Sequence, residues 1–223
     1  MIDLPDFEKA FAYENDFYLT CQPSRIAKAI AHYEAFKMIR DVPGVILECG
    51  VFKGASFVRF AAFREMFGGA ESRRMIAFDT FAEFPKTGYA DDQMLRTGFI
   101  AAAGASSISD RQLMDVLQRK GCARNVELIA GDILETVPAF VERNPGLKIA
   151  LLNLDTDVLE PARIVLEHLY PRMSRNGVVL LDNYGVFPGE TAAIDACFAG
   201  MWADGGGVRR FPFAATPSYM VVG

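Results

Sequence analysis

Acidic side chains follow five apolar segments of this 223-residue chain. They are Glu48, Asp79, Asp132, the pair Asp155 and Asp157, and Asp182, which Asn183 follows directly. A single acid in such a place is usually a turn or cap residue. Five acidic positions brought together would repel one another unless a cation or a hydroxyl-rich ligand satisfied them. The pattern therefore predicts a binding site for a cationic or polyhydroxylated ligand.

The first of these acids stands in a glycine-containing segment, Glu48-x-Gly50-x-x-x-Gly54, with Ser56 two residues further on. The spacing matches neither the dinucleotide fingerprint G-x-G-x-x-G nor the phosphate-binding loop G-x-x-x-x-G-K-[ST]. A carboxylate there repels phosphate but suits a ligand that carries an ammonium or a sulfonium. The absence of G-x-G-x-x-G disfavours a nicotinamide oxidoreductase.

The elements that must position these residues alternate along the chain. Apolar strand candidates lie near 44–49, 75–79, 126–130, 148–154 and 177–182, and helical patterns near 54–67, 109–120, 135–143, 160–170 and 189–202. Several strands are continuously apolar, which is typical of a parallel sheet covered on both faces. Two further strands, 208–213 and 218–222, are joined by few residues and should pair antiparallel. We predict an α/β fold: a doubly wound, mostly parallel seven-stranded sheet with a C-terminal antiparallel hairpin.

In such a sheet, ligands bind beyond the carboxyl ends of the strands, where all five acidic positions lie. We expect one domain over 1–223, with N-terminal helices in 1–42. Residues 82–106 show no clear period and are predicted to form a mobile lid. The lid, with Tyr89, Arg96 and Phe99, is expected to select a ligand together with Tyr184 and Phe187. The alternative for these aromatic residues is that they anchor loops by packing onto the body of the protein.

Bulk properties exclude some classes of protein. The net charge is −5 without a basic block, which argues against nucleic acid as a partner. No apolar run approaches the roughly 18 residues of a membrane helix, and the start lacks the pattern of a signal peptide. The four cysteines form no C-x-x-C pair and are expected to be reduced thiols. We therefore expect a cytoplasmic protein.

Five segments together resemble a known family. They are PGVILECGVFKGAS at 43–56, FDTFAEFP at 78–85, GDILETVP at 131–138, LDTD at 154–157 and LDNYG at 181–185. In this order they resemble class I S-adenosylmethionine-dependent methyltransferases, and more narrowly the macrocin O-methyltransferase-like family. The resemblance implies a Rossmann-like methyltransferase fold, S-adenosylmethionine as cofactor, and a sugar or glycoside hydroxyl as the methyl acceptor.

The resemblance also implies roles for cofactor-binding residues. Glu48, Gly50 and Gly54 would line the methionine part of the cofactor, and Ser56 would start a helix whose N-terminus favours a carboxylate. Asp79 would accept hydrogen bonds from the ribose hydroxyls. Asp132 would bind the adenine amino group, with Ile133 against the ring. Two alternatives stay open: Gly54 serves helix–strand packing, and Asp132 belongs to an ordinary turn.

Asp155, Asp182 and Asn183 match positions that bind a divalent metal in the resembled family. That family usually has a second Asp at the position of Asn183, whereas catechol O-methyltransferases use Asp, Asp and Asn. Oxygen ligands alone favour a hard ion such as Mg²⁺, which would polarise the acceptor hydroxyl. The alternative is that Asp182 and Asn183 form a strand-ending turn.

Asp157 is the candidate general base beside Asp155. The two side chains point the same way if the strand conformation persists through them. The alternative is that Asp157 caps the helix that begins before Pro161. The two histidines, His32 and His168, are expected to be satisfied or exposed helix residues and not general bases.

Two other functions are carried forward: methylation of a catechol or other phenol, and a cofactor-binding module without turnover. The identity of the acceptor is not readable from the sequence. A homo-oligomer paired through the N-terminal helices is also left open.

Overall fold

A seven-stranded sheet in the order β3-β2-β1-β4-β5-β7-β6 forms the centre of the computed structural model, which describes residues 1–200 and 207–223. The strands are β1 (Val45–Cys49), β2 (Met75–Asp79), β3 (Val126–Ala130), β4 (Ile149–Leu154), β5 (Met173–Leu181), β6 (Arg209–Arg210) and β7 (Ser218–Val221). Strands β1 to β5 pair in parallel, and β7 pairs antiparallel with both β5 and β6. The predicted fold class is confirmed.

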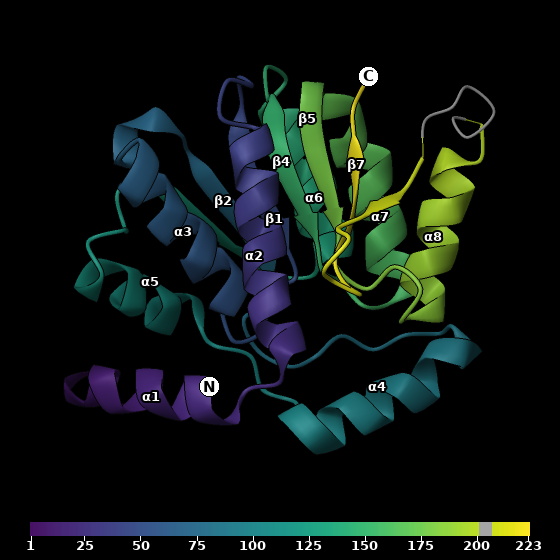
Figure 1. Ribbon diagram of the computed structural model, residues 1–223. Helices are drawn as coiled ribbons and strands as arrows, with labels where there is room; N and C mark the ends of the chain where they lie inside the picture. Colours follow the sequence, from purple (N-terminus) through teal and green to yellow (C-terminus); the bar gives the residue numbers. More distant parts are fainter. Residues whose placement is uncertain (201–206) are drawn as a thin grey trace.

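Helices cover both faces of the sheet (Figure 1). They are α1 (Ala10–Thr20), α2 (Pro23–Met38), α3 (Ala55–Phe67), α4 (Ala90–Ala103), α5 (Asp110–Arg119), α6 (Ile133–Arg143), α7 (Leu159–Leu169) and α8 (Pro188–Phe198). Short 3₁₀ turns lie at Phe7–Lys9, Ala70–Ser72 and Tyr170–Arg172. Helices α2, α3 and α5 pack on one face, and α6, α7 and α8 on the other. Positions 201–202 of the predicted helix 189–202 lie outside the described residues.

Alternate strand residues supply the two hydrophobic layers. In β1, Ile46 packs with α2 and α3, whereas Leu47 and Cys49 pack on the side of α6 and α7. In β5, Val178 and Val179 divide between the layers in the same way. Because side chains alternate across a strand, a strand buried on both faces must be apolar at every position. This explains the continuous apolar runs of the sequence.

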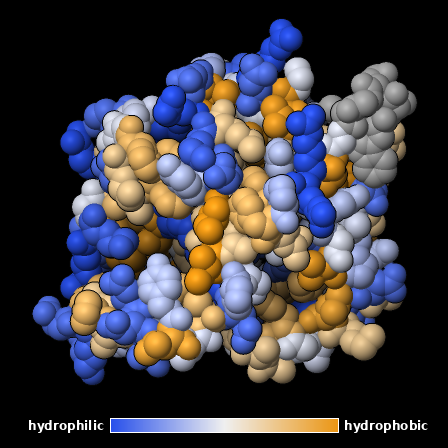
Figure 2. All heavy atoms as spheres, in the orientation of Figure 1, coloured by the Kyte–Doolittle hydropathy of each residue, from blue (hydrophilic) through white to orange (hydrophobic). Residues whose placement is uncertain are grey.

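Helix α4 was not predicted, because the segment 82–106 shows no clear helical period. The structure explains why: of its residues only Asp92 is buried, while Met94 and Leu95 are exposed. A helix without an apolar stripe lacks the signal on which periodicity depends. Figure 2 shows hydrophobic side chains interspersed with hydrophilic ones along the lower part of the molecule, where α1 and α4 lie.

Strand limits differ from prediction at the C-terminal side of the sheet. Strand β5 begins at Met173 instead of 177. Its first residues were not predicted as a strand, because the polar run Ser174-Arg175-Asn176 lacks the apolar signal used for the prediction. Strand β6 is confined to two residues of the predicted 208–213. None of the described helices has both the length and the apolar character needed to cross a membrane.

Gly50 joins the ends of β1 and β4. Its φ is +87°, and a Cβ at this position would lie 1.8 Å from the carbonyl oxygen of Asp155. The Gly50 amide donates to the Phe78 carbonyl at 2.9 Å, and the Asp155 amide donates to the Cys49 carbonyl at 2.9 Å. The close approach that requires glycine is therefore between two strand ends of the protein itself.

We predict that Gly50→Ala lowers the free energy of unfolding by about 3 kcal/mol or more, because it combines a strained φ with a backbone clash. The matched control is Gly98→Ala in exposed α4, where a Cβ meets nothing within 4 Å. That variant should be unchanged or more stable by about 0.5–1 kcal/mol. Urea unfolding followed by circular dichroism measures both, and equal stabilities would contradict the assignment.

Candidate active site

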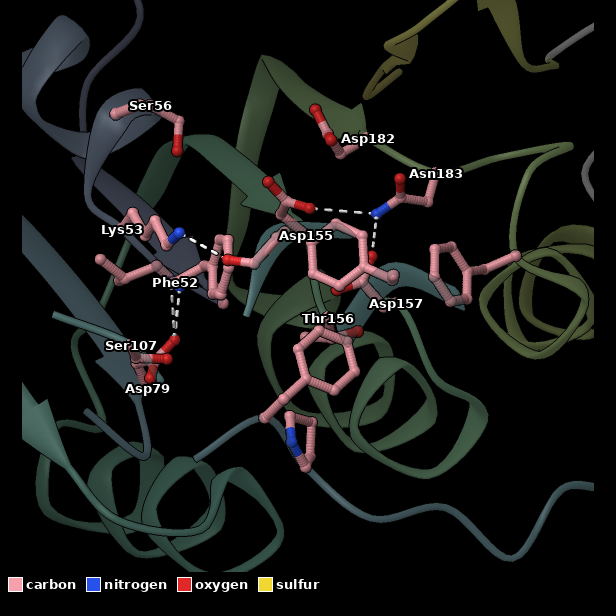
Figure 3. A pocket seen from close by; sticks show the side chains of 18 of the residues that line it. Phe52, Lys53, Ser56, Asp79, Ser107, Asp155, Thr156, Asp157, Asp182 and Asn183 are labelled. Carbon is pink, nitrogen blue, oxygen red and sulfur yellow. Dashed lines mark hydrogen bonds between the residues drawn. The ribbon is translucent and has the colours of Figure 1, made fainter. Parts of the chain in front are cut away.

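A cavity of about 670 Å³ opens at the carboxyl ends of the parallel strands (Figure 3). Nine of the residues predicted for the site line it: Gly50, Ser56, Asp79, Asp132, Ile133, Asp155, Asp157, Asp182 and Asn183. Glu48 and Gly54 do not line it. The sheet thus gathers side chains from four strand ends around one space, as the doubly wound topology requires.

Asp79 stabilises the loop that follows β1 by accepting hydrogen bonds from its amides. Its Oδ2 accepts hydrogen bonds from the amides of Val51 at 2.6 Å and Phe52 at 3.0 Å, and its Oδ1 accepts one from Phe81 at 2.7 Å. A carboxylate can accept more than one hydrogen bond on each oxygen, so these contacts leave capacity for a ligand. The predicted role toward ribose hydroxyls is compatible with this position.

Glu48 does not line the cavity but accepts a hydrogen bond from Ser56, which does. It is fully buried, and its Oε1 accepts from the Ser56 hydroxyl at 2.7 Å while its Oε2 accepts from the Asn153 amide at 3.2 Å. Burial, reinforced by the charge of Asp155, raises the pKa of Glu48 to about 8. Glu48 is therefore mainly a neutral acid at pH 7, and it acts on the cavity through Ser56 rather than by facing it.

Gly54 and Asp132 have structural roles that the sequence analysis left open. Gly54 has φ +83° and stands before the first turn of α3, where a Cβ would lie 3.1 Å from Cδ1 of Leu113 in α5. This favours the packing alternative for Gly54. Asp132 caps α6, because its Oδ1 accepts from the Leu134 amide at 2.9 Å. It also lines the cavity beside Ile133, so the cap and the predicted adenine contact are compatible.

Asp155 and Asp157 converge on one amide group. Nδ2 of Asn183 donates to Oδ1 of Asp155 at 3.0 Å and to Oδ1 of Asp157 at 2.7 Å (Figure 3). The backbone conformation that brings the two side chains together differs from the prediction. Asp157 has φ +66°, so the extended strand does not continue through it. The alternative that Asp157 caps α7 is wrong. The N-cap residue of α7 is Val158, whose side chain makes no capping hydrogen bond.

Both carboxyl groups have raised pKa values. Burial, with the charge of Asp182 next in size, raises the pKa of Asp155 to about 7. Burial and the charges of Asp155 and Glu190 raise the pKa of Asp157 well above its usual range. Like charges held together away from water disfavour simultaneous ionisation. This pair therefore holds a proton more strongly than ordinary aspartates do.

Glu190 is a site residue that the sequence analysis missed. It is fully buried in the first turn of α8, and its Oε2 accepts from the amides of Thr156 at 3.1 Å and Asp157 at 2.8 Å. Its Oε1 accepts from the Asn183 amide at 3.1 Å. Burial and the Asp155 charge raise the pKa of Glu190 to about 8. Glu190 thus ties the loops after β4 and β5 together.

Helix α2 contributes two further residues that the sequence analysis did not place here. Nζ of Lys28 lies 2.5 Å from Oδ2 of Asp182, and Nε2 of His32 lies 3.9 Å from Oδ1 of the same residue. His32 is a helix residue, as expected, and does not line the cavity; it is buried, stacks on Phe60 and has Nδ1 3.1 Å from Arg59. The spacing of four residues, which puts positions 28 and 32 on one helix face, was the available signal.

Asp182 has a lowered pKa, in contrast to Asp155 and Asp157 beside it. Burial alone would raise its pKa, but contact with His32 and the charge of Lys28 outweigh burial and hold the pKa at about 2. The pKa of Lys28 is raised in turn: burial acts to lower it, and the charges of Asp155 and Asp182 more than compensate. Lys28 and Asp182 therefore form an ammonium–carboxylate pair.

The predicted Mg²⁺ ligands lie at one edge of the cavity. Oδ2 of Asp182 and Oδ1 of Asp155 already have hydrogen-bond partners, whereas the buried Oδ1 of Asp182 has none among the described residues. The Lys28 ammonium occupies Oδ2 of Asp182, and Asn183 turns its N–H donors toward Asp155. Within 1–200 and 207–223, no three His, Cys, Asp or Glu side chains are grouped as ligands of one ion. Arranged in this way, Asp155, Asp182 and Asn183 do not fit a divalent cation. Mg²⁺ stays a prediction from the sequence.

The segment predicted as a lid is docked onto the body in this structure. Asp92 is fully buried; its Oδ1 accepts from the Gly189 amide at 2.8 Å and its Oδ2 from the Leu159 amide at 3.2 Å. One acid of α4 thus satisfies the first turns of both α7 and α8, where free amides favour negative charge. Glu160 adds a bond from the Gly88 amide at 2.9 Å.

Aromatic side chains from the lid form one wall of the cavity. Phe99 of α4 lies 5.3 Å from both Phe52 and Phe84, and 6.5 Å from Phe187, between ring centroids. All four rings line the cavity. The other candidates, Tyr89, Arg96 and Tyr184, are not among its lining residues. Arg96 instead donates to the Pro85 and Phe84 carbonyls and anchors the loop before α4.

Taken together, the sheet order, the antiparallel β7 and the acids at the strand ends define a Rossmann-like methyltransferase fold. The calicheamicin methyltransferase CalS11 has the same fold, with a TM-score of 0.80 and 28% identity over 99% of this chain and 87% of that one. The O-methyltransferase NovP superimposes with a TM-score of 0.73 at 20% identity, over 87% of this chain and 78% of that one.

The sequence comparison narrows this class to one family. The macrocin O-methyltransferase (TylF) family model matches residues 25–199, and the chain belongs to that family. A relative from Streptomyces olivaceus, named as an 8-demethyl-8-(2,3-dimethoxy-alpha-L-rhamnosyl)-tetracenomycin-C 4'-O-methyltransferase, is 30% identical over 160 residues. That alignment covers 70% of this chain and 56% of the relative. The chain thus spans less than two thirds of the length of the curated relatives that it matches.

Asp92→Ala should release α4. It removes two hydrogen bonds to a charged group, each contributing about 1.5–3 kcal/mol. We expect hydrogen exchange of the amides in 90–103 to accelerate by at least about tenfold, without change in α5. The matched control is Asp91→Ala, an exposed acid in the same turn. Equal exchange in the two variants would show that Asp92 does not hold the helix.

Glu48→Gln should change the pH dependence of stability. An unfolded Glu loses its proton near pH 4.3, whereas Glu48 in the folded protein holds it to about pH 8. Between these values the folded state binds the extra proton, so the free energy of unfolding falls as pH rises. Urea unfolding from pH 5 to 8 should show a shallower fall for Glu48→Gln than for wild type. Exposed Glu142→Gln should keep the wild-type slope; a wild-type slope in Glu48→Gln would refute the assignment.

Proposed function

We propose that this chain transfers the methyl group of S-adenosylmethionine to a hydroxyl of a sugar or glycoside. The observation that carries the proposal is the pair Asp155 and Asp157, held by Asn183 at the mouth of a strand-end cavity in a member of the macrocin O-methyltransferase family. The Streptomyces olivaceus relative is named for methylation of a rhamnosyl group, which supports a glycoside as acceptor.

The cofactor is proposed to lie along β1, β2 and β3. Gly50 and Ser56 would meet its methionine part, with Glu48 behind them. Asp79 would accept from the ribose hydroxyls, and Asp132 with Ile133 would meet the adenine. All of these except Glu48 line the cavity, in the order of the strands from the centre of the sheet to its edge.

Asp157 is proposed as the general base. A lone pair of the acceptor oxygen forms a bond to the methyl carbon as the carbon–sulfur bond breaks, and the sulfonium becomes a neutral thioether. The hydroxyl proton passes to the Asp157 carboxylate. A base with a raised pKa accepts a proton more readily than an ordinary aspartate, provided that it starts ionised. Asp155 and Asn183 position it.

The aromatic wall of Phe52, Phe84, Phe99 and Phe187 is proposed to exclude water and to position the acceptor. These rings also favour the second candidate function, methylation of a catechol or other phenol, whose ring would pack among them. A cofactor-binding module without turnover would not need Asp155 and Asp157 coupled through one amide.

The predicted cellular setting and assembly remain proposals. Cys49 and Cys122 are free and buried, which accords with a reducing cytoplasm. Self-association through the N-terminal helices stays a prediction; α1 has no buried residue and exposes Phe11 and Leu19. The acidic net charge continues to argue against nucleic acid as the acceptor.

Asp157→Asn should separate binding from chemistry. We expect cofactor affinity, measured by calorimetry, to stay within about twofold, and methyl transfer to fall by about 10²–10⁴ because the proton has no acceptor. Labelled cofactor is first used to screen glycosides and catechols with wild type, and the best acceptor is then used for the variants. Asp16→Asn on exposed α1 is the control. Full activity in Asp157→Asn would remove Asp157 as the base, and transfer only to catechols would replace the sugar acceptor.

A further inference from the structure

We propose that the Lys28 ammonium is the resident cation of the acid cluster and takes the place of a divalent metal, so that methyl transfer by this chain needs no metal ion. The inference rests on the proposed function for its catalytic readout. It concerns the charge that stabilises the acceptor oxygen, and it starts from a residue that lies outside the five segments of the family resemblance.

The position of Lys28 carries the proposal. The side chain reaches from α2 to the end of β5, where Nζ lies 2.5 Å from Oδ2 of Asp182. The side chain of Asp182 is 4% exposed and that of Lys28 is 21% exposed. Lys28 also lines the cavity, together with Asp155 and Asp157. An ion pair so largely withdrawn from water has much stronger Coulomb attraction than a surface pair, and a small cation that entered there would meet the ammonium at close range.

The charge balance points the same way. Of the three predicted metal ligands, Asp155 and Asp182 can carry negative charge, and Asn183 cannot. One ammonium leaves this set with a net charge of −1 when both acids are ionised. A set of three carboxylates around a divalent ion has the same net charge. Asn183 and Lys28 together therefore give this set the net charge that three carboxylates around a divalent ion would have.

The orientation of Asn183 is the third observation. Its amide donates to both Asp155 and Asp157, so it serves these carboxylates as a hydrogen-bond donor where a metal ligand would present oxygen. The fully buried imidazole of His32 faces the other side of Asp182, with Nε2 3.9 Å from Oδ1, beyond hydrogen-bond distance. The described residues thus place an ammonium, an amide and an imidazole around the carboxylates.

Lys28 has hydrogen-bond donors to spare. An ammonium carries three N–H groups, and one is directed at Asp182. The remaining donors can meet an acceptor oxygen in the cavity and stabilise the negative charge that develops as its proton leaves for Asp157. A preorganised donor of this kind typically contributes about 10²–10³ to the rate. The Lys28 ammonium thereby polarises the hydroxyl, which is the role that the sequence analysis gave to the metal.

The test compares wild type, Lys28→Met, Lys28→Ala and Lys28→Arg in the full chain after dialysis against EDTA. Lys37→Met is the matched control, because Lys37 lies on the same helix and pairs at the surface with Glu34. Methyl transfer is measured with and without millimolar Mg²⁺. Binding of Mn²⁺ is measured by electron paramagnetic resonance in the absence of acceptor. Circular dichroism confirms that each variant is folded.

We expect wild type and Lys37→Met to keep full activity in EDTA and to show no Mn²⁺ bound at the site. Lys28→Met should lose about 10²-fold in kcat. Lys28→Ala, which vacates the space beside Asp182, should bind Mn²⁺ and recover at least tenfold of its lost activity with Mg²⁺. Lys28→Arg should retain partial metal-free activity. A merely structural lysine would not produce metal dependence on removal.

Loss of wild-type activity in EDTA with recovery in Mg²⁺ would overturn the proposal, as would an undiminished Lys28→Met. If the Lys28 variants do not fold, wild type in EDTA and its Mn²⁺ titration still decide. Cofactor binding without transfer to any acceptor, with or without Mg²⁺, would refute the proposed function instead. The Mn²⁺ measurement stands apart from that failure: binding to wild type contradicts the resident lysine, and binding only to Lys28→Ala supports it.

Discussion

The structure depends on burying several carboxyl groups at one edge of a parallel sheet. Asp182 and Glu190 lie at or near strand ends almost without access to water, and Asp155 beside them is half-buried; each would be costly there as an isolated charge. The protein meets this cost with different partners. Asp182 receives the Lys28 ammonium, Glu190 receives three backbone amides, and Asp155 shares the Asn183 amide with Asp157. Each partner also fixes a loop around the cavity.

The same edge divides into two regions with different chemistry. Toward β1, β2 and β3, backbone amides and single acids hold short loops, as where Asp79 binds the amides of Val51 and Phe52. Toward β4 and β5, acids gather and carry shifted pKa values. The first region suits recognition of a large polar cofactor, and the second suits transfer of a proton. Between them, Gly50 lets the ends of β1 and β4 meet.

Helix α4 links the cavity to the two helices behind β4 and β5. Asp92 accepts amides from the first turns of α7 and α8, and Phe99 on the same helix extends toward the cavity wall. Movement of α4 would therefore both uncover the aromatic wall and expose two helix ends. A lid built in this way has a defined docked state, held by buried hydrogen bonds, in contrast to a loop without structure.

Elements with local signals could be predicted from the amino-acid sequence. Continuous apolar runs marked the parallel strands, and an acid after each run placed Asp79, Asp132, Asp155 and Asp182 at the ligand-binding edge, because a parallel sheet aligns its carboxyl ends. The partners of those acids became known from the folded structure, because they come from distant parts of the chain. Lys28 lies 154 positions from Asp182, and Asp92 lies 97 from Gly189, so no spacing along the chain shows these contacts. Helix α4 escaped notice for a related reason: it is held by one buried acid, and periodicity detects only a buried apolar face.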